Sequence, residues 1–154
     1  MNTLCRAALM AVLAASASGF SAVPGAAANG HCQPVGGSVF TNFVDSTDAV
    51  GPVSGDLAGA VSVQILAVNG NVYHIRKHFV TTSGDTMTVA DTDFTTYPTS
   101  VSGLAAATEP MTITGGTGRF DGATGSVTFF GAISGDGEVT LRYSGTICFE
   151  SAKQ

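Results

Sequence analysis

The feature that most restricts the fold of this chain is a glycine-rich run that ends at Gly125. Its glycines are Gly115, Gly116, Gly118, Gly122 and Gly125. Glycine costs roughly 1 kcal/mol relative to alanine inside a helix, whereas between strands it supplies positive φ and lets two backbones approach closely. The run therefore predicts a structural turn between strands. Its one large apolar residue, Phe120, is expected to fold under the end of the sheet, and Arg119 to pair with an acid or a carbonyl.

The segments on both sides of this run alternate apolar and polar residues with the period of two that marks a β-strand. The predicted strands cover residues 39–44, 57–68, 72–82, 86–90, 111–114, 126–133 and 139–149. Residues 45–55 are expected to form a loop, and residues 91–108 a long connection with room for one short helical turn. Seven or eight strands joined by short turns predict an all-β fold. It is either a single eight-stranded antiparallel up-and-down barrel or a β-sandwich.

The first residues of the chain indicate export. A basic residue, Arg6, precedes a small apolar run over residues 7–20, and Ala26 and Ala28 supply the small residues of a cleavage site. This is the layout of a secretory signal peptide, and its apolar core is too short to span a membrane. We therefore expect residues 1–28 to be a signal peptide and residues 29–154 a single β-barrel domain. That domain would be secreted or periplasmic, with no membrane insertion after cleavage.

Two cysteines remain in the mature chain, Cys32 and Cys148, close to its two ends. An even number of cysteines in an exported chain predicts a disulfide, the alternative being two free thiols. The bond would link the first and last segments, which is what a closed barrel needs of its first and last strands. We favour the barrel over the sandwich for this reason, and because closure leaves no exposed sheet edge.

The charge balance excludes two classes of partner. Eleven acidic residues against six basic ones give a net charge of −5, and the only basic cluster is the pair Arg76 and Lys77. Nucleic acid and anionic membrane surfaces are therefore not expected to bind. The glycine-rich run also lacks the Gly-Lys-Ser/Thr ending of a P-loop, and Asp121 stands where a dinucleotide fingerprint would need its third glycine. No nucleotide cofactor is expected.

The run from Ile113 to Gly125, Ile-Thr-Gly-Gly-Thr-Gly-Arg-Phe-Asp-Gly-Ala-Thr-Gly, resembles the glycine-rich connection of the allene oxide cyclase and dirigent barrels. Similar runs occur in small exported bacterial proteins of unassigned function, whose flanking patterns look like Gly55–Gly59 and Tyr143–Cys148. The resemblance implies an eight-stranded barrel, a homo-oligomer (trimer or dimer), and a central cavity for a hydrophobic small molecule. It also implies a cyclisation or coupling that uses no metal or organic cofactor. It assigns no catalytic residue.

His74, Arg76 and His78 form the one polar cluster with chemical promise, since alternate residues of a strand share a face. The two histidines are about 13 Å apart along a strand at ~3.3 Å per residue, so they cannot share one metal ion. No metal site is expected. The ligand-binding candidates are these three residues together with Tyr73 and Tyr143.

The register of the hairpin at Asn69-Gly70 decides where this cluster points. A two-residue turn would place it inside the barrel, whereas a shift of one residue would pair Ile65 with Ile75 and turn the cluster towards solvent. We favour the outward arrangement, because burying Arg76 without a partner is costly. Lys77 then points inward and is expected to extend its amine out of the barrel end.

Two functions remain. The first is an exported barrel that binds an apolar small molecule and guides a cofactor-free cyclisation or coupling. The alternative is a non-catalytic structural or interaction module of the cell envelope with a packed interior. A hydrolase has no support, since no Gly-x-Ser-x-Gly elbow is present. Asp91 and Asp93 share a strand face, but aspartates at such a position usually stabilise turns.

Overall fold

The computed structural model describes residues 31–150, so the predicted signal peptide at residues 1–28 lies outside the described residues. The described chain forms nine β-strands and one short 3₁₀ turn: β1 (His31–Phe43), β2 (Asp48–Gly55), β3 (Gly59–Asn69), β4 (Val72–Thr81), β5 (Thr86–Val89), β6 (Thr92–Pro98), β7 (Leu104–Gly116), η1 (Gly118–Phe120), β8 (Thr124–Ser134) and β9 (Glu138–Phe149). Within this part of the chain no helix has the length and apolar character needed to cross a membrane.

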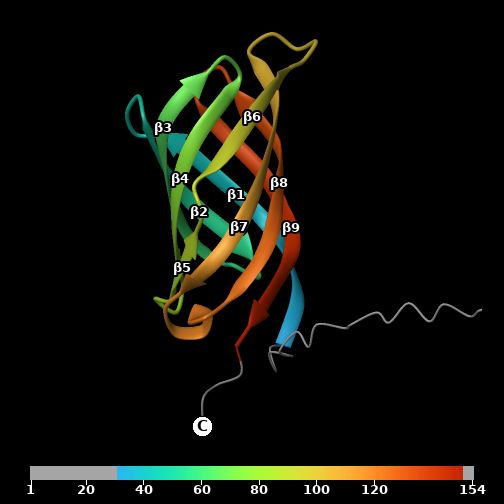
Figure 1. Cartoon of the computed structure of the whole chain (residues 1–154). Helices are drawn as coiled ribbons and strands as arrows, with labels where there is room; N and C mark the ends of the chain where they lie inside the picture. Colours follow the sequence, from blue (N-terminus) through green and yellow to red (C-terminus); the bar gives the residue numbers. More distant parts are fainter. Residues whose placement is uncertain (1–30, 151–154) are drawn as a thin grey trace, which may run out of the picture.

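The strands close into an antiparallel barrel (Figure 1). The first strand pairs with the last over twelve opposed positions, beginning with His31 opposite Phe149. β5 and β6 together fill one strand position between β4 and β7. In Figure 1, β5 forms the lower half of this position and β6 the upper half, and pairing is interrupted between them at Ala90 and Asp91. The barrel therefore has eight strand positions. This confirms the predicted eight-stranded barrel rather than a sandwich.

One end of the barrel, called the closed end here, is filled by side chains. Its inward residues are less than 2 % exposed: Phe120, Phe129, Met111, Ile113, Ile147 and Val127. The turn η1 brings Phe120 under the strands, as predicted, and its ring centroid lies 5.9 Å from that of Phe149. Arg119 donates a hydrogen bond of 3.2 Å to the carbonyl of Asp56. The middle of the glycine-rich run is thus a turn that plugs the barrel, whereas Gly115 and Gly116 end β7 and Gly125 lies in β8, so these three are not turn residues. The opposite end, with turns at residues 70–71, 99–103 and 135–137, is called the mouth.

Two segments predicted as loops are strands. Most of residues 45–55 form β2. Ala49 and Val53 are buried in this strand, but Gly51 and Pro52 between them interrupt the apolar and polar alternation that would have indicated a strand. Residues 91–108 hold β6 and the start of β7, and the loop shrinks to residues 99–103. The expectation of a long connection there is wrong because small residues face inward, and Ala107 is fully buried without producing a visible apolar alternation.

The β3–β4 hairpin has the shifted register, with Ile65 opposite Ile75. The turn consists of Gly70, at φ +62°, and Asn71, one residue later than the predicted Asn69-Gly70. A bulge at Leu66 then moves the pairing by one residue. Because side chains alternate along a strand, this single extra residue decides which face of β3 meets which face of β4.

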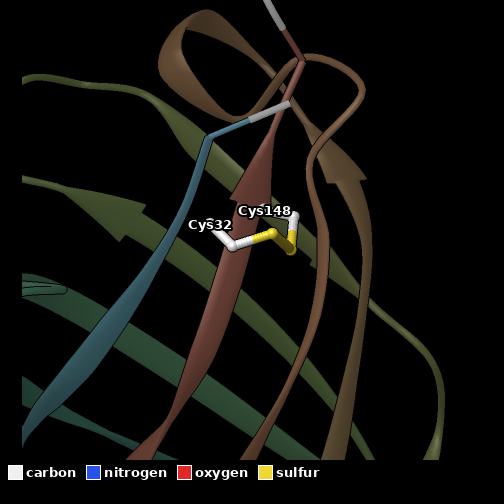
Figure 2. Close-up of a disulfide and its surroundings, with 2 residues drawn as sticks. All are labelled: Cys32 and Cys148. Atoms are coloured by element: carbon white, nitrogen blue, oxygen red, sulfur yellow. A yellow bond between two sulfur atoms is a disulfide. The ribbon is translucent and has the colours of Figure 1, made fainter. Parts of the chain in front are cut away.

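Cys32 and Cys148 form a disulfide between β1 and β9, which confirms the predicted pairing (Figure 2). The two cysteines lie directly opposite each other in the ladder. The bond joins the two strands that close the barrel, next to their ends at the closed end. The presence of this disulfide is consistent with an oxidising environment.

Substituting Gly118 by Val is expected to lower the free energy of unfolding by more than ~1–2 kcal/mol, measured by urea denaturation. Gly118 has φ +58°, and a Cβ there would lie 1.9 Å from Oδ1 of Asp85. Gly70→Val is the comparison, since Gly70 has a similar φ but nothing lies within 4 Å of the added Cβ, so it should show the backbone strain without the contact with Asp85. A loss below about 0.5 kcal/mol for Gly118→Val would contradict a conformational role for this glycine.

Candidate functional site

The barrel interior holds an apolar cavity of about 50 Å³, called the inner cavity here. Eight of the strands contribute to its wall, all but β5, because their inward side chains converge above the closed end. The lining residues are Val39, Thr41, Phe43, Ala49, Val63, Ile65, Tyr73, Ile75, Lys77, Phe94, Glu109, Ile133, Val139 and Leu141. Aliphatic and aromatic side chains dominate this wall, which is the usual character of a small-molecule site.

The inner cavity faces the mouth of the barrel. A wider surface hollow of about 660 Å³ lies at the mouth and shares Phe43, Ile65, Tyr73 and Ile133 with the inner cavity. These four side chains therefore stand between this surface hollow, called the mouth hollow here, and the inner cavity. A molecule that enters the barrel from the mouth must pass them.

The floor of the inner cavity carries a buried ion pair. Nζ of Lys77 lies 2.5 Å from Oε2 of Glu109, and the two side chains are 4 % and 0 % exposed. The next inward residues towards the closed end, Phe79 on β4 and Met111 on β7, no longer line the cavity. Nζ also lies 4.3 Å from the centroid of the Phe129 ring, which supports the ammonium from below.

Glu109 has an unused acceptor. Its Oε1 is the one buried side-chain polar atom of the described residues that lacks a hydrogen-bond partner. Burial raises the pKa of the Glu109 carboxyl above its usual range, and the neighbouring Lys77 opposes part of that rise. A buried carboxylate oxygen without a partner is unfavourable. Glu109 lines the inner cavity, so its Oε1 is an acceptor for a polar group that reaches the floor.

Sequence reasoning missed this pair. The inward position of Lys77 follows from the outward arrangement of its neighbours, but the expectation that its amine leaves the barrel end is wrong. The amine stays inside because Glu109 supplies a counter-charge there. The inward position of Glu109 could have been predicted from its neighbours. Ala107 and Met111 are both buried, and Glu109 lies between them at the alternate position of the strand that points to the same face.

The polar cluster of β4 lies on the outer face of the barrel, which confirms the outward arrangement. Arg76 donates to both carboxylate oxygens of Asp91, at 2.9 and 2.7 Å, and Nδ1 of His74 lies 3.0 Å from Oδ1 of Asp93. The hydrogen bonds from Arg76 lower the pKa of the Asp91 carboxyl. His78 is exposed beside them. None of the three cluster residues lines the inner cavity.

The two candidate tyrosines lie in different places. Tyr73 lines the inner cavity near the mouth, with its ring edge-on to Phe94 at 6.1 Å between centroids. Tyr143 lies below the floor, where its hydroxyl donates to the carbonyl of Ser54 at 2.8 Å and accepts from the backbone N–H of Leu57 at 2.9 Å. Burial raises the pKa of the Tyr143 hydroxyl. Its hydrogen bonds tie β9 to the end of β2 and to the connection after it, which is a structural role.

Comparison with known proteins adds little to this description. No protein-family model matches the chain, and no curated protein matches it. Among solved structures, a pterocarpan synthase dirigent protein matches with a TM-score of 0.37 and 13% identity, over 81% of this chain and 88% of that chain. A likeness at this level carries no argument about function. Fold and site together define a closed antiparallel barrel with an apolar cavity above a buried lysine–glutamate pair.

Proposed function

We propose that the protein is an exported barrel that binds an apolar small molecule through its mouth. The observation that carries this proposal is the inner cavity: an apolar wall facing the mouth, with one ion pair and an unpartnered carboxylate oxygen at its floor. Apolar walls supply binding energy, and a few polar groups set the orientation of a ligand. The Cys32–Cys148 bond supports export, because disulfides persist in oxidising compartments.

The two hollows suggest how such a ligand lies. The inner cavity, at about 50 Å³, accommodates only a slender end of a molecule, whereas the mouth hollow, at about 660 Å³, has the size of a small-molecule site. A ligand would therefore rest its bulk in the mouth and direct one end towards Glu109. Confinement in one orientation is also what a guided cyclisation or coupling requires, since such reactions gain rate from restricted geometry.

The second candidate is a non-catalytic structural or interaction module of the cell envelope. The small volume of the inner cavity and the dense packing of the closed end favour it. In this case the interior serves stability alone, and the Lys77–Glu109 pair links β4 to β7 and binds no ligand. Binding measurements separate the two candidates.

Titration of ¹⁵N-labelled protein with linear alcohols from butan-1-ol to decan-1-ol tests the proposal. Saturable NMR shifts are expected at Tyr73 and Phe94 rather than at the closed end. Ile133→Trp, which fills the passage from the mouth, should weaken binding at least about tenfold. Phe130→Trp, on the exposed face of the same strand, is the matched control and should leave the affinity unchanged. An absence of saturable binding across the series would support the structural module instead.

A further inference from the structure

We propose that Lys77 is a covalent capture site for small apolar aldehydes, which it holds as an imine at the floor of the inner cavity. This inference rests on the proposed function, because it assigns a chemical class and a bonding mode to the ligand of the same cavity. The ε-amine of lysine adds to carbonyl carbon when it is unprotonated, and an apolar pocket favours the unprotonated form. The side chain of Lys77 is 4 % exposed, and Nζ lies next to Glu109, a carboxylate that can take its proton.

Glu109 supplies the proton transfers that imine formation needs. Its Oε2 lies 2.5 Å from Nζ and is placed to take a proton from the ammonium. Burial already raises the pKa of this carboxyl, which makes the protonated acid accessible inside the barrel. The unpartnered Oε1 can accept a hydrogen bond from the hydroxyl of the addition product.

The reaction balances within the pair and the aldehyde. Glu109 accepts one proton from the Lys77 ammonium, and the free amine forms a C–N bond as the carbonyl π bond breaks. The new alkoxide takes a proton from the nitrogen to give a carbinolamine. The carbinolamine hydroxyl then takes the proton held by Glu109 and leaves as water. One ammonium and one aldehyde thus give one iminium and one water, and Glu109 is a carboxylate again.

The product fits the same surroundings as the reactant. The iminium keeps the positive charge next to Glu109 and over the face of Phe129, where Nζ lies 4.3 Å from the ring centroid. The hydrocarbon part of the aldehyde points from Nζ into the apolar wall, towards Ile75 and Tyr73. A polar or charged aldehyde would lose its hydration there without compensation. The site therefore selects carbonyl compounds by the apolar character of their substituent.

Trapping with hexanal and sodium cyanoborohydride tests the inference on the intact protein. Hydride reduces the iminium to a stable secondary amine, and peptide mapping by mass spectrometry locates the hexyl group. The chain has only one other lysine, Lys153, which serves as the internal reference. We expect Lys77 to be modified at least about tenfold faster than Lys153. With glyoxylate, a charged aldehyde, the preference should vanish. Modification of Lys153 at an equal or higher rate with hexanal would overturn the inference.

A variant of Glu109 tests whether proton transfer by this residue, and not only the burial of Lys77, determines the rate of trapping. Glu109→Gln keeps the shape of the side chain and leaves Lys77 in place, yet it should slow trapping by hexanal at least about tenfold, because the proton acceptor is lost. A rate equal to or above that of the wild type would overturn the assigned role of Glu109. Glu150→Gln, at an exposed carboxylate of the closed end, is the matched control and should trap hexanal at the wild-type rate.

Hexan-1-ol distinguishes this inference from the proposed function. It has the same chain as hexanal but no carbonyl carbon, so it is expected to bind reversibly and to compete with trapping at Lys77. Binding of hexan-1-ol without any preferential adduct at Lys77 would overturn the covalent capture and leave the proposed binding function intact. If hexan-1-ol does not bind and Lys77 is not modified, both are overturned.

Discussion

Glu109→Leu is expected to lower the free energy of unfolding by about 3–5 kcal/mol, because it leaves the Lys77 ammonium buried without a counter-charge. No other acidic side chain of the described residues makes an ion pair with Nζ, and the side chain of Lys77 is only 4 % exposed. The pair as a whole, however, need not stabilise the barrel. Removing two charges from water costs energy that their attraction only partly returns.

The double substitution Lys77→Met with Glu109→Leu should therefore restore most of that loss and give a stability near that of the wild type. Urea denaturation of the wild type, the two single variants and the double variant measures the coupling. A Glu109→Leu variant within about 1 kcal/mol of the wild type would contradict a buried charge at Lys77, since an uncompensated charge costs more.

The pH dependence gives a second test of the same pair. Because burial raises the pKa of Glu109, the folded state holds the carboxyl proton more tightly than the unfolded state does. The stability from this group is present below the unfolded value of about 4.3 and is lost as the pH rises towards the raised folded pKa. Glu109→Gln should remove this loss. Asp91 acts in the opposite sense, since its lowered pKa gives stability that disappears as the pH falls.

Replacing both Cys32 and Cys148 with Ser is expected to lower the melting temperature and to leave the barrel recognisable by circular dichroism. The bond joins positions 116 residues apart, and loop entropy sets the upper limit of its contribution at about 4–5 kcal/mol. The fold should persist because β1 and β9 still pair along twelve positions. Reduced wild-type protein is the control and should melt close to the double variant. Reactive thiols at Cys32 and Cys148 in unreduced protein would contradict the bond.

Alternation and turn residues were enough to predict the barrel, the plug at Phe120 and the disulfide, since each depends on local pattern or on the two chain ends. The strand β2 escaped prediction because Gly51 and Pro52 break the pattern locally, while the ladders on both sides hold it in the sheet. The strand β6 escaped because Phe94 is its one buried residue, so the segment shows no apolar alternation. Tertiary pairing overrides propensity in both places.

The candidate site was harder to predict for a different reason. Its central pair joins residues on β4 and β7, and their meeting depends on every register between those strands, including the interruption between β5 and β6. One extra residue in any ladder turns a side chain to the other face. The orientation of the His74, Arg76 and His78 cluster on β4 depends on register in the same way. The bulge at Leu66 on β3 changes the pairing by one residue, and this change distinguishes the outward orientation from the inward one.

The closed end carries a practical consequence for handling this protein. The described chain starts and ends there, at His31 and Glu150, on the opposite side of the barrel from the mouth (Figure 1). A carrier protein, a purification tag or a chip surface attached at either terminus would hold every molecule with its opening towards the solution. Because His31 and Phe149 are neighbours in the ladder, a short linker would also join the ends. New termini at residues 99–103 would then place a reporter group at the rim of the opening.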